Sequence, residues 1–294
     1  MYHRFTIQLI AALFLAGPIW AVEVKSASEH GTYVWHHPDE WFGGFSALHL
    51  SDNGRHLIAL SDRARLVHAE IERKGDGIAG VEITGHWPVL SSTGQRLSGI
   101  AGDSEGLATI ADGSYYISFE GVHRVAHYST PGSKAHVLPR PEAWDQLRLN
   151  GAFEGLAIDG QGRLYTLTEK SRTEDGDIPV YRWDGQGWST PFVLPHRGKF
   201  LPVSADFGPD GRLYVLERSV FLTGFRSRLR RWQIEADMPT REEVLFTTGA
   251  GKHDNLEGLT IWRDDQDRLR ATMVSDDNFL ALQRTELVEY LLPD

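Results

Sequence analysis

The sequence contains no cysteine, which excludes disulfide bonds, thiolate metal sites and a cysteine nucleophile. It has one long apolar run, near the N-terminus, and that run is too short to span a bilayer comfortably. The 40 acidic residues outnumber the 30 basic ones, and the formal charge of −10 would repel a phosphate backbone over most of the surface. We therefore expect no membrane span in the mature chain, no nucleic-acid partner, and a monomer that acts on a small molecule.

The N-terminus has the pattern of a secretory signal peptide. Arg4 precedes an apolar run over residues 5–15, a Gly17-Pro18 breaker follows, and the small residue Ala21 offers a cleavage point. This pattern predicts a signal peptide over residues 1–21. Because an exported chain without disulfides suits a bacterial periplasm, we expect a periplasmic or secreted protein. We expect residues 22–294 to form a single domain.

A motif of two short strands recurs five times, at intervals of roughly 50 residues. Each copy has an apolar segment, a turn rich in Asp and Gly, and a second alternating segment that ends near a carboxylate. The copies are FSALHLSDNGRHLIALSD from Phe45, DSEGLATIADGSYYISFE from Asp103, FEGLAIDGQGRLYTLTE from Phe153, PVSADFGPDGRLYVLER from Pro202 and LEGLTIWRDDQDRLRATMVSD from Leu256. Further strand-like segments follow most copies. The repeat predicts an all-β fold, a β-propeller of about five four-stranded blades, with six blades as the alternative.

The last copy is one strand short, because the chain ends soon after the strand-like residues 286–292. Near the mature N-terminus, residues 31–35 form a strand-like segment that belongs to no copy. We expect this N-terminal strand to complete the last blade and close the ring, which would leave no open sheet edge.

Each hairpin should bring two carboxylates to one mouth of the central channel, because the first strand of a blade lines the channel and the second returns beside it. The residues that begin the first strands are Glu105, Glu154 and Glu257, with Ser46 and Val203 as exceptions. Those that end the second strands are Asp62, Glu120, Glu169, Glu217 and Asp276, with a register uncertain by one residue. Further oxygen ligands could come from Asn150, Asp206, Asp254, Asn255 and Asp277.

Such a ring of acids requires compensation, since two like charges a few ångströms apart repel by roughly 1 to 4 kcal/mol at a surface-like dielectric. Raised carboxyl pKa values, arginine or lysine partners, or a bound cation would each compensate. Oxygen ligands without cysteine or a well-placed histidine pair favour a hard ion, and we expect Ca²⁺. The alternative is that the glutamates only bond backbone amides of neighbouring blades and face solvent.

Four segments carry a resemblance to a known family. The Glu-Gly-Leu copies at residues 154–156 and 257–259, LERSVFLTGF at 216–225 and SDDNF at 275–279 resemble the exported bacterial "phytase-like, esterase-like" propeller family. The resemblance covers nearly all of the mature chain. It implies calcium ions at the channel mouth that bind and hydrolyse phosphate monoesters. True phytases have six blades, so the count of five is a departure from that pattern.

A phosphate group would also need cationic donors. The loops after the second strands supply Lys170, Arg172, Arg218, Arg226 and Arg228. We expect Lys170, Arg172, Arg218 and Arg228 to bind the substrate. They could equally serve as ion-pair partners of the acidic ring.

Three other functions stay open. The G-x-S-x-G pentad at residues 102–106 fits a serine-esterase motif, but it enters a strand instead of a strand-to-helix elbow. A lactonase-type propeller would use one divalent ion held by Glu154, Asn255 and Asp276. A binding or scaffold propeller would perform no catalysis, since a fold does not dictate a function.

Overall fold

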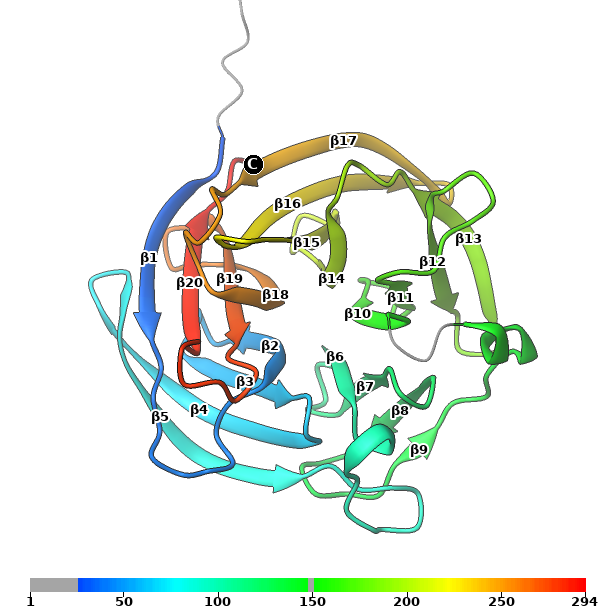
Figure 1. The fold of residues 1–294 in the computed structure, drawn as a ribbon, viewed down its shortest axis with the longest axis horizontal. Helices are drawn as coiled ribbons and strands as arrows, with labels where there is room; N and C mark the ends of the chain where they lie inside the picture. The colour runs from blue at the N-terminus through cyan, green and yellow to red at the C-terminus, as the bar shows by residue number, and fades with distance from the viewer. Residues whose placement is uncertain (1–25, 148–150) are drawn as a thin grey trace, which may run out of the picture.

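The computed structural model describes residues 26–147 and 151–294, so the expected signal peptide and Asn150 lie outside the described residues. Five four-stranded antiparallel sheets are arranged in a ring, with their innermost strands around the central axis where the sequence predicts the channel (Figure 1). The prediction of a five-bladed β-propeller is therefore confirmed, and the six-bladed alternative is wrong. Within the described ranges, no helix is long and apolar enough to cross a membrane.

The four strands of each blade follow one another outward from the channel. Blade 1 contains β2 (Phe45–Ser51), β3 (His56–Ser61), β4 (Arg65–Lys74) and β5 (Gly77–Pro88). Blade 2 contains β6 (Ser104–Thr109), β7 (Tyr115–Phe119), β8 (Arg124–Tyr128) and β9 (His136–Val137). Blade 3 contains β10 (Phe153–Ile158), β11 (Leu164–Thr168), β12 (Ile178–Trp183) and β13 (Trp188–Leu194). Blade 4 contains β14 (Leu201–Phe207), β15 (Leu213–Phe221), β16 (Gly224–Glu235) and β17 (Met238–Thr247). Blade 5 contains β18 (Asn255–Arg263), β19 (Leu269–Asp276), β20 (Glu286–Leu291) and β1 (Ser28–Val34). Short 3₁₀ helices span Gly99–Ala101 and Glu142–Gln146.

The N-terminal strand closes the ring, as the sequence predicts. Strand β1 pairs antiparallel with β20, with Tyr33 opposite Leu287 and Val34 opposite Glu286. In Figure 1 the blue β1 lies beside the red β20 at the outer edge of blade 5. The first and last strands of the described residues therefore share one sheet, and blade 5 has all four of its strands.

The hydrophobic core lies between neighbouring blades. One cluster joins Phe45, Leu57 and Val67 of blade 1 to Val274 and Leu287 of blade 5, and all five side chains are buried. Alternating side chains of the inner strands supply such contacts, since successive residues of a strand point to opposite faces. This packing holds the innermost strands together around the channel.

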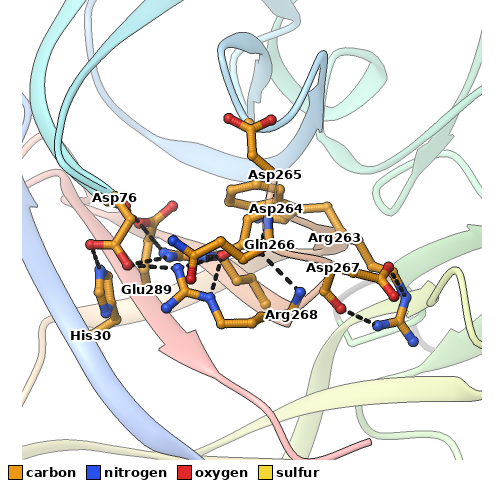
Figure 2. Close-up of polar contacts among 12 residues, drawn as sticks. His30, Asp76, Arg263, Asp264, Asp265, Gln266, Asp267, Arg268 and Glu289 are labelled. Carbon is orange, nitrogen blue, oxygen red and sulfur yellow. Dashed lines mark hydrogen bonds and ion pairs between the residues drawn. The ribbon is translucent and has the colours of Figure 1, made fainter.

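A network of ion pairs joins blade 5 to blade 1 at the channel end opposite the mouth where the inner strands begin. Figure 2 shows Asp76, in the turn after β4, beside His30 of β1 and Arg268. The Asp76 carboxylate lies 2.6 Å from the Arg268 guanidinium and 3.0 Å from that of Arg270, which is fully buried. Arg270 also pairs with Asp264 at 2.7 Å. Each acidic group of this network has a basic partner within it. We therefore assign the network a structural role, which is to hold blade 5 against blade 1.

Candidate functional site

The innermost strand of every blade begins with a β-bulge. The register shifts lie between Phe45/Ala47, Ser104/Gly106, Phe153/Gly155, Pro202/Ser204 and Leu256/Gly258. The extra residue in each bulge is Ser46, Glu105, Glu154, Val203 or Glu257, the same position that the sequence repeat picks out. Because a bulge re-aims the side chain of its extra residue, three glutamates are directed to one end of the channel.

The glycine after each of these glutamates allows neighbouring inner strands to approach closely. A Cβ atom on Gly155 would lie 2.8 Å from the backbone nitrogen of Ala205, and one on Gly106 would lie 2.8 Å from that of Leu156. Real Cβ atoms essentially never come this close to backbone atoms. The Glu-Gly-Leu triplet therefore combines a bulged glutamate, a close backbone contact and a buried leucine.

Replacing Gly155 with alanine should lower the free energy of unfolding by about 1–3 kcal/mol, because the added methyl group forces two inner strands apart. Urea unfolding would measure the loss. Gly160→Ala is the matched control, since a Cβ atom there meets nothing within 4 Å. Equal effects of the two substitutions would contradict this explanation of the triplet.

The pairing of first and second strands gives the register that the sequence leaves open. The residues opposite the last one before each bulge are Ser61, Phe119, Thr168, Glu217 and Ser275. The next residues are therefore equivalent, and they are Asp62, Glu120, Glu169, Arg218 and Asp276. The predicted alignment of blade 4 is wrong by one residue, and an arginine occupies the position that holds a carboxylate in the other four blades.

Glu217 lies outside the acidic ring for this reason. Its carboxylate accepts a hydrogen bond from Arg228 Nε at 2.6 Å and from Arg230 Nε at 2.9 Å, and it is fully buried. Neighbouring residues of a strand face opposite sides, so Glu217 faces away from the ring that Arg218 contacts. We correct both assignments: Glu217 and Arg228 form a buried ion pair of blade 4, and we retain neither as a metal or substrate ligand.

Eight carboxylates form what we call the acidic ring. Its members are Asp62, Asp103, Glu105, Glu120, Glu154, Glu169, Glu257 and Asp276. All but Asp62 and Asp103 are buried. Carboxylate oxygens of Asp103, Glu105 and Glu120 lie within 4.8 Å of one another. Every blade except blade 4 thus contributes acidic groups to one opening.

Burial and mutual repulsion raise the carboxyl pKa values of Glu105, Glu154, Asp276 and Asp62. Burial raises the pKa of Glu105 and of Glu154 well above the ordinary glutamate value, and neighbouring carboxylates raise it further. For Asp276, burial and then the charge of Glu257 raise the pKa to about 8. Burial raises the pKa of Asp62 to about 6. Without a cation, these carboxyl groups therefore hold their protons to a higher pH than ordinary carboxyl groups do.

Arg218 is the cation that enters the ring. Its guanidinium contacts Glu257, donates to Glu169 Oε1 at 3.0 Å and donates to Asn255 Oδ1 at 2.7 Å. Burial acts to lower the pKa of Arg218, but attraction by Glu257, Glu154 and Glu169 outweighs it, and the pKa lies above its ordinary value. The amide oxygen of Asn255, considered above as a ligand of a lactonase-type ion, is therefore already in a hydrogen bond.

The other expected substrate ligands are also engaged. Lys170 Nζ lies 2.6 Å from Glu169 Oε2. Arg172 folds back to the main chain and donates to the carbonyl oxygens of Ser171, at 2.8 Å, and of Glu169, at 2.6 Å. These cations lie at the mouth, but their charged ends are directed to groups of the protein itself.

Asp103 is a ring member that the sequence reasoning missed. It stands two residues before Glu105, as Asn255 stands before Glu257, and a hydrogen bond joins it to Glu105. That shared spacing in two of the five copies was a signal that could have identified it.

The remaining oxygen donors have structural roles. Asp277 Oδ1 accepts hydrogen bonds from the backbone nitrogens of Gly44 at 2.9 Å and Phe279 at 3.0 Å. Asp254 accepts from the backbone nitrogen of Arg284 at 2.9 Å. Asp206 lies near the far end of β14 and accepts from the backbone nitrogen of Ile261 at 2.7 Å. None of the three is a member of the acidic ring.

The serine of the G-x-S-x-G pentad also has a structural role. Ser104 begins β6, is fully buried, and donates its hydroxyl hydrogen to the carbonyl oxygen of Ser61 at 2.7 Å. A nucleophile elbow requires an exposed serine between a strand and a helix, and Ser104 meets neither condition.

The sequence matches the family described as "Phytase-like: Esterase-like activity of phytase" over residues 40–279. The chain belongs to the phytase-like family. The match includes all eight members of the acidic ring, from Asp62 to Asp276. No curated protein is matched by this phytase-like sequence.

Solved structures similar to the phytase-like chain show its fold alone. The catalytic domain of an α-L-arabinofuranosidase from Coprinopsis cinerea has 10% identity and a TM-score of 0.55, over 91% of this chain and 96% of that one. An α-L-arabinofuranosidase from Podospora anserina has 12% identity and a TM-score of 0.52, over 92% and 97%. A putative gluconolactonase has 16% identity and a TM-score of 0.44, over 84% and 74%, too low to carry an argument.

Proposed function

We propose that this phytase-like protein is a calcium-dependent phosphoester hydrolase that acts at the acidic ring. One observation carries the proposal: eight carboxylates converge at one opening. Among the described residues, only Arg218 and Lys170 form ion pairs with members of this acidic ring. This excess of buried negative charge has to be offset by protons or by a cation. From the N-terminal pattern we also propose that the protein acts in the periplasm or outside the cell.

The donor set fits calcium. Calcium prefers six to eight oxygen ligands at about 2.3–2.6 Å, so oxygens that share one ion lie within roughly 5 Å of each other. The carboxylates of Asp103, Glu105 and Glu120 meet this condition, with oxygens within 4.8 Å. Glu120 is held in place because its Oε1 accepts hydrogen bonds from the backbone nitrogens of Gly151 and Ala152. These three residues are our candidates for the ligands of one ion.

When bound, calcium would polarise a phosphoryl oxygen and lower the pKa of a bound water molecule. The residues of the chain would contribute position and charge. Glu105, as the extra residue of a bulge, is fixed by the pairing of β6 with β7. Arg218 forms ion pairs with Glu169 and Glu257, so the protein itself supplies positive charge to these two carboxylates. One part of the ring is thus neutralised by the protein, and the other is left for an ion.

The test is hydrolysis of p-nitrophenyl phosphate and of a lactone, each with calcium and with chelator. We expect turnover of the phosphate ester that chelation abolishes. Glu105→Gln should weaken calcium affinity by roughly 10-fold, because it removes one charged ligand. Glu174→Gln, at an exposed glutamate after β11, is the matched control. Phosphate turnover that survives chelation would overturn the proposal, and turnover of the lactone alone would favour the lactonase-type alternative.

A further inference from the structure

Arg63 differs from the other cations at the mouth. It follows Asp62 in the turn between β3 and β4, and its side chain is exposed. The guanidinium carbon lies 3.2 Å from the centroid of the Phe279 ring. Among the residues that the structure describes, its side chain has no hydrogen-bond or ion-pair partner, while its backbone nitrogen donates to Ser61 Oγ. The charge of Arg63 acts to lower the pKa of the neighbouring Asp62, but none of the five guanidinium donors is used in a hydrogen bond to a described residue, so they are available to a ligand.

The aromatic ring beneath Arg63 is held by a strained backbone. Asn278 and Phe279 both have left-handed conformations, with φ of 48° and 52°. The backbone nitrogen of Asn278 donates to Asp276 Oδ1 at 2.6 Å, and that of Phe279 donates to Asp277 Oδ1 at 3.0 Å. Strain of this kind persists where the surrounding structure fixes it, and it is concentrated at functional sites. The segment thus uses one carboxylate of the acidic ring to position Phe279.

Gly44 explains how the aromatic ring of Phe279 can lie so near Asp62. It has a φ of 64°, and a Cβ atom there would clash with both the Phe279 ring and Asp62 Oδ1. A side chain at this position would push the aromatic platform away from the acidic ring. The glycine therefore lets Phe279, Arg63 and Asp62 lie together.

Arg63 stands where two pockets meet. One pocket, of about 420 Å³, is lined by Asp62, Arg63, Ser98, Gly99, Ile100 and Asp103, and so includes two members of the acidic ring. The other, of about 630 Å³, is lined in part by Trp35, Phe42, Phe279 and Leu280 together with Arg63. The first pocket offers acidic and cationic groups side by side. The second exposes more apolar than polar surface, although polar residues such as His36, Glu40 and Asp277 also line it.

We propose that Arg63 binds the oxyanion of the substrate in the first pocket, and that the second takes an apolar or aromatic organic group. The substrate class is then a phosphate ester of an apolar alcohol. A guanidinium matches the geometry of phosphate oxygens, and stacking on Phe279 fixes its plane. The inference rests on the proposed function, because Asp62 and Asp103 would repel an oxyanion unless a cation offsets their charge.

The experiment measures the binding of inorganic phosphate by calorimetry, with saturating calcium. We expect Arg63→Gln to weaken phosphate binding by roughly 10-fold or more, because a charge-assisted bidentate contact is lost. Arg63→Lys should bind phosphate more tightly than Arg63→Gln but more weakly than the wild type, since lysine keeps the charge but lacks the paired N–H donors of the guanidinium. Arg96→Gln is the control, because Arg96 is an exposed arginine of the β5–β6 connection and lines neither pocket. Calcium should raise the melting temperature of all four proteins, which shows that the ion site is intact in each.

Each outcome separates this inference from the proposed function. Phosphate binding to Arg63→Gln at wild-type affinity, or no phosphate binding to the wild type, would overturn the role of Arg63 whatever calcium does. Failure of calcium to stabilise the wild type would remove the proposed function, while phosphate binding that still depends on Arg63 would support the anion site. Phenyl phosphate should bind tighter than methyl phosphate, and equal affinities would contradict the apolar organic group.

Discussion

Replacing Arg218 with methionine should lower the free energy of unfolding by about 3–5 kcal/mol in calcium-free buffer at pH 8. The side chain is largely buried and pairs with Glu169 and Glu257, which are themselves buried. Methionine keeps much of the volume but removes the charge, so both carboxylates lose their partner. The loss should be smaller at pH 5, because burial raises the pKa of Glu257 and this carboxyl can then take up a proton. Denaturant unfolding at the two pH values measures both effects.

Calcium should recover part of the stability lost in Arg218→Met, because a divalent ion can replace the missing positive charge in the acidic ring. Arg226→Met is the control. Arg226 lies on the same β15–β16 hairpin but donates to the carbonyl oxygen of Thr248 and has no carboxylate partner among the described residues. If Arg218→Met is no more destabilising than Arg226→Met, Arg218 does not neutralise the ring.

In the presence of chelator, the free energy of unfolding of the wild type should fall by about 3 kcal/mol or more between pH 5 and pH 8. The pKa of Asp276 is raised to about 8 and that of Asp62 to about 6, and the pKa values of Glu105 and Glu154 are raised as well. A carboxyl with a higher pKa in the folded state keeps its proton longer there than in the unfolded chain. It therefore stabilises the fold below its ordinary pKa, and that stability is lost as the pH rises through the folded-state value.

Calcium should abolish this decrease in stability, because it binds deprotonated carboxylates and so competes best with protons at high pH. The melting temperature with saturating calcium should change little from pH 5 to pH 8, while the value in chelator should drop. Asp276→Asn should flatten the curve in chelator, since the amide cannot lose a proton. A melting temperature in chelator that rises over this range would contradict the raised pKa values.

The repeat predicted much of the fold and part of the site. Strand pairing within each copy, the number of blades and the closing role of the N-terminal strand follow from periodicity and from the missing last strand. The positions of Glu105, Glu154 and Glu257 also follow, because all three recur before a Gly-Leu pair. The reason for that pair, a bulge beside a close backbone contact, requires coordinates.

The site predictions were wrong where the repeat alone could not determine the strand register or the partner of a charged residue. Glu217 and Arg218 both fit the end of a second strand, and only the pairing of Glu217 with Pro202 shows which of them faces the ring. The sequence also does not show whether a charged residue already forms an ion pair within the protein. Arg228 donates a hydrogen bond to Glu217, whereas the Arg63 guanidinium lies over the ring of Phe279, which is 216 residues later in the sequence.

Calorimetric titration of calcium into chelator-treated protein at pH 7, repeated in two buffers with different ionisation enthalpies, tests the acidic ring most directly. If the ring is a cation site that holds protons when empty, calcium binds and releases protons, so the observed heat differs between the buffers. Glu105→Gln should bind more weakly and release fewer protons. Absence of a binding heat in both buffers, or binding of unchanged strength in Glu105→Gln, would contradict the account.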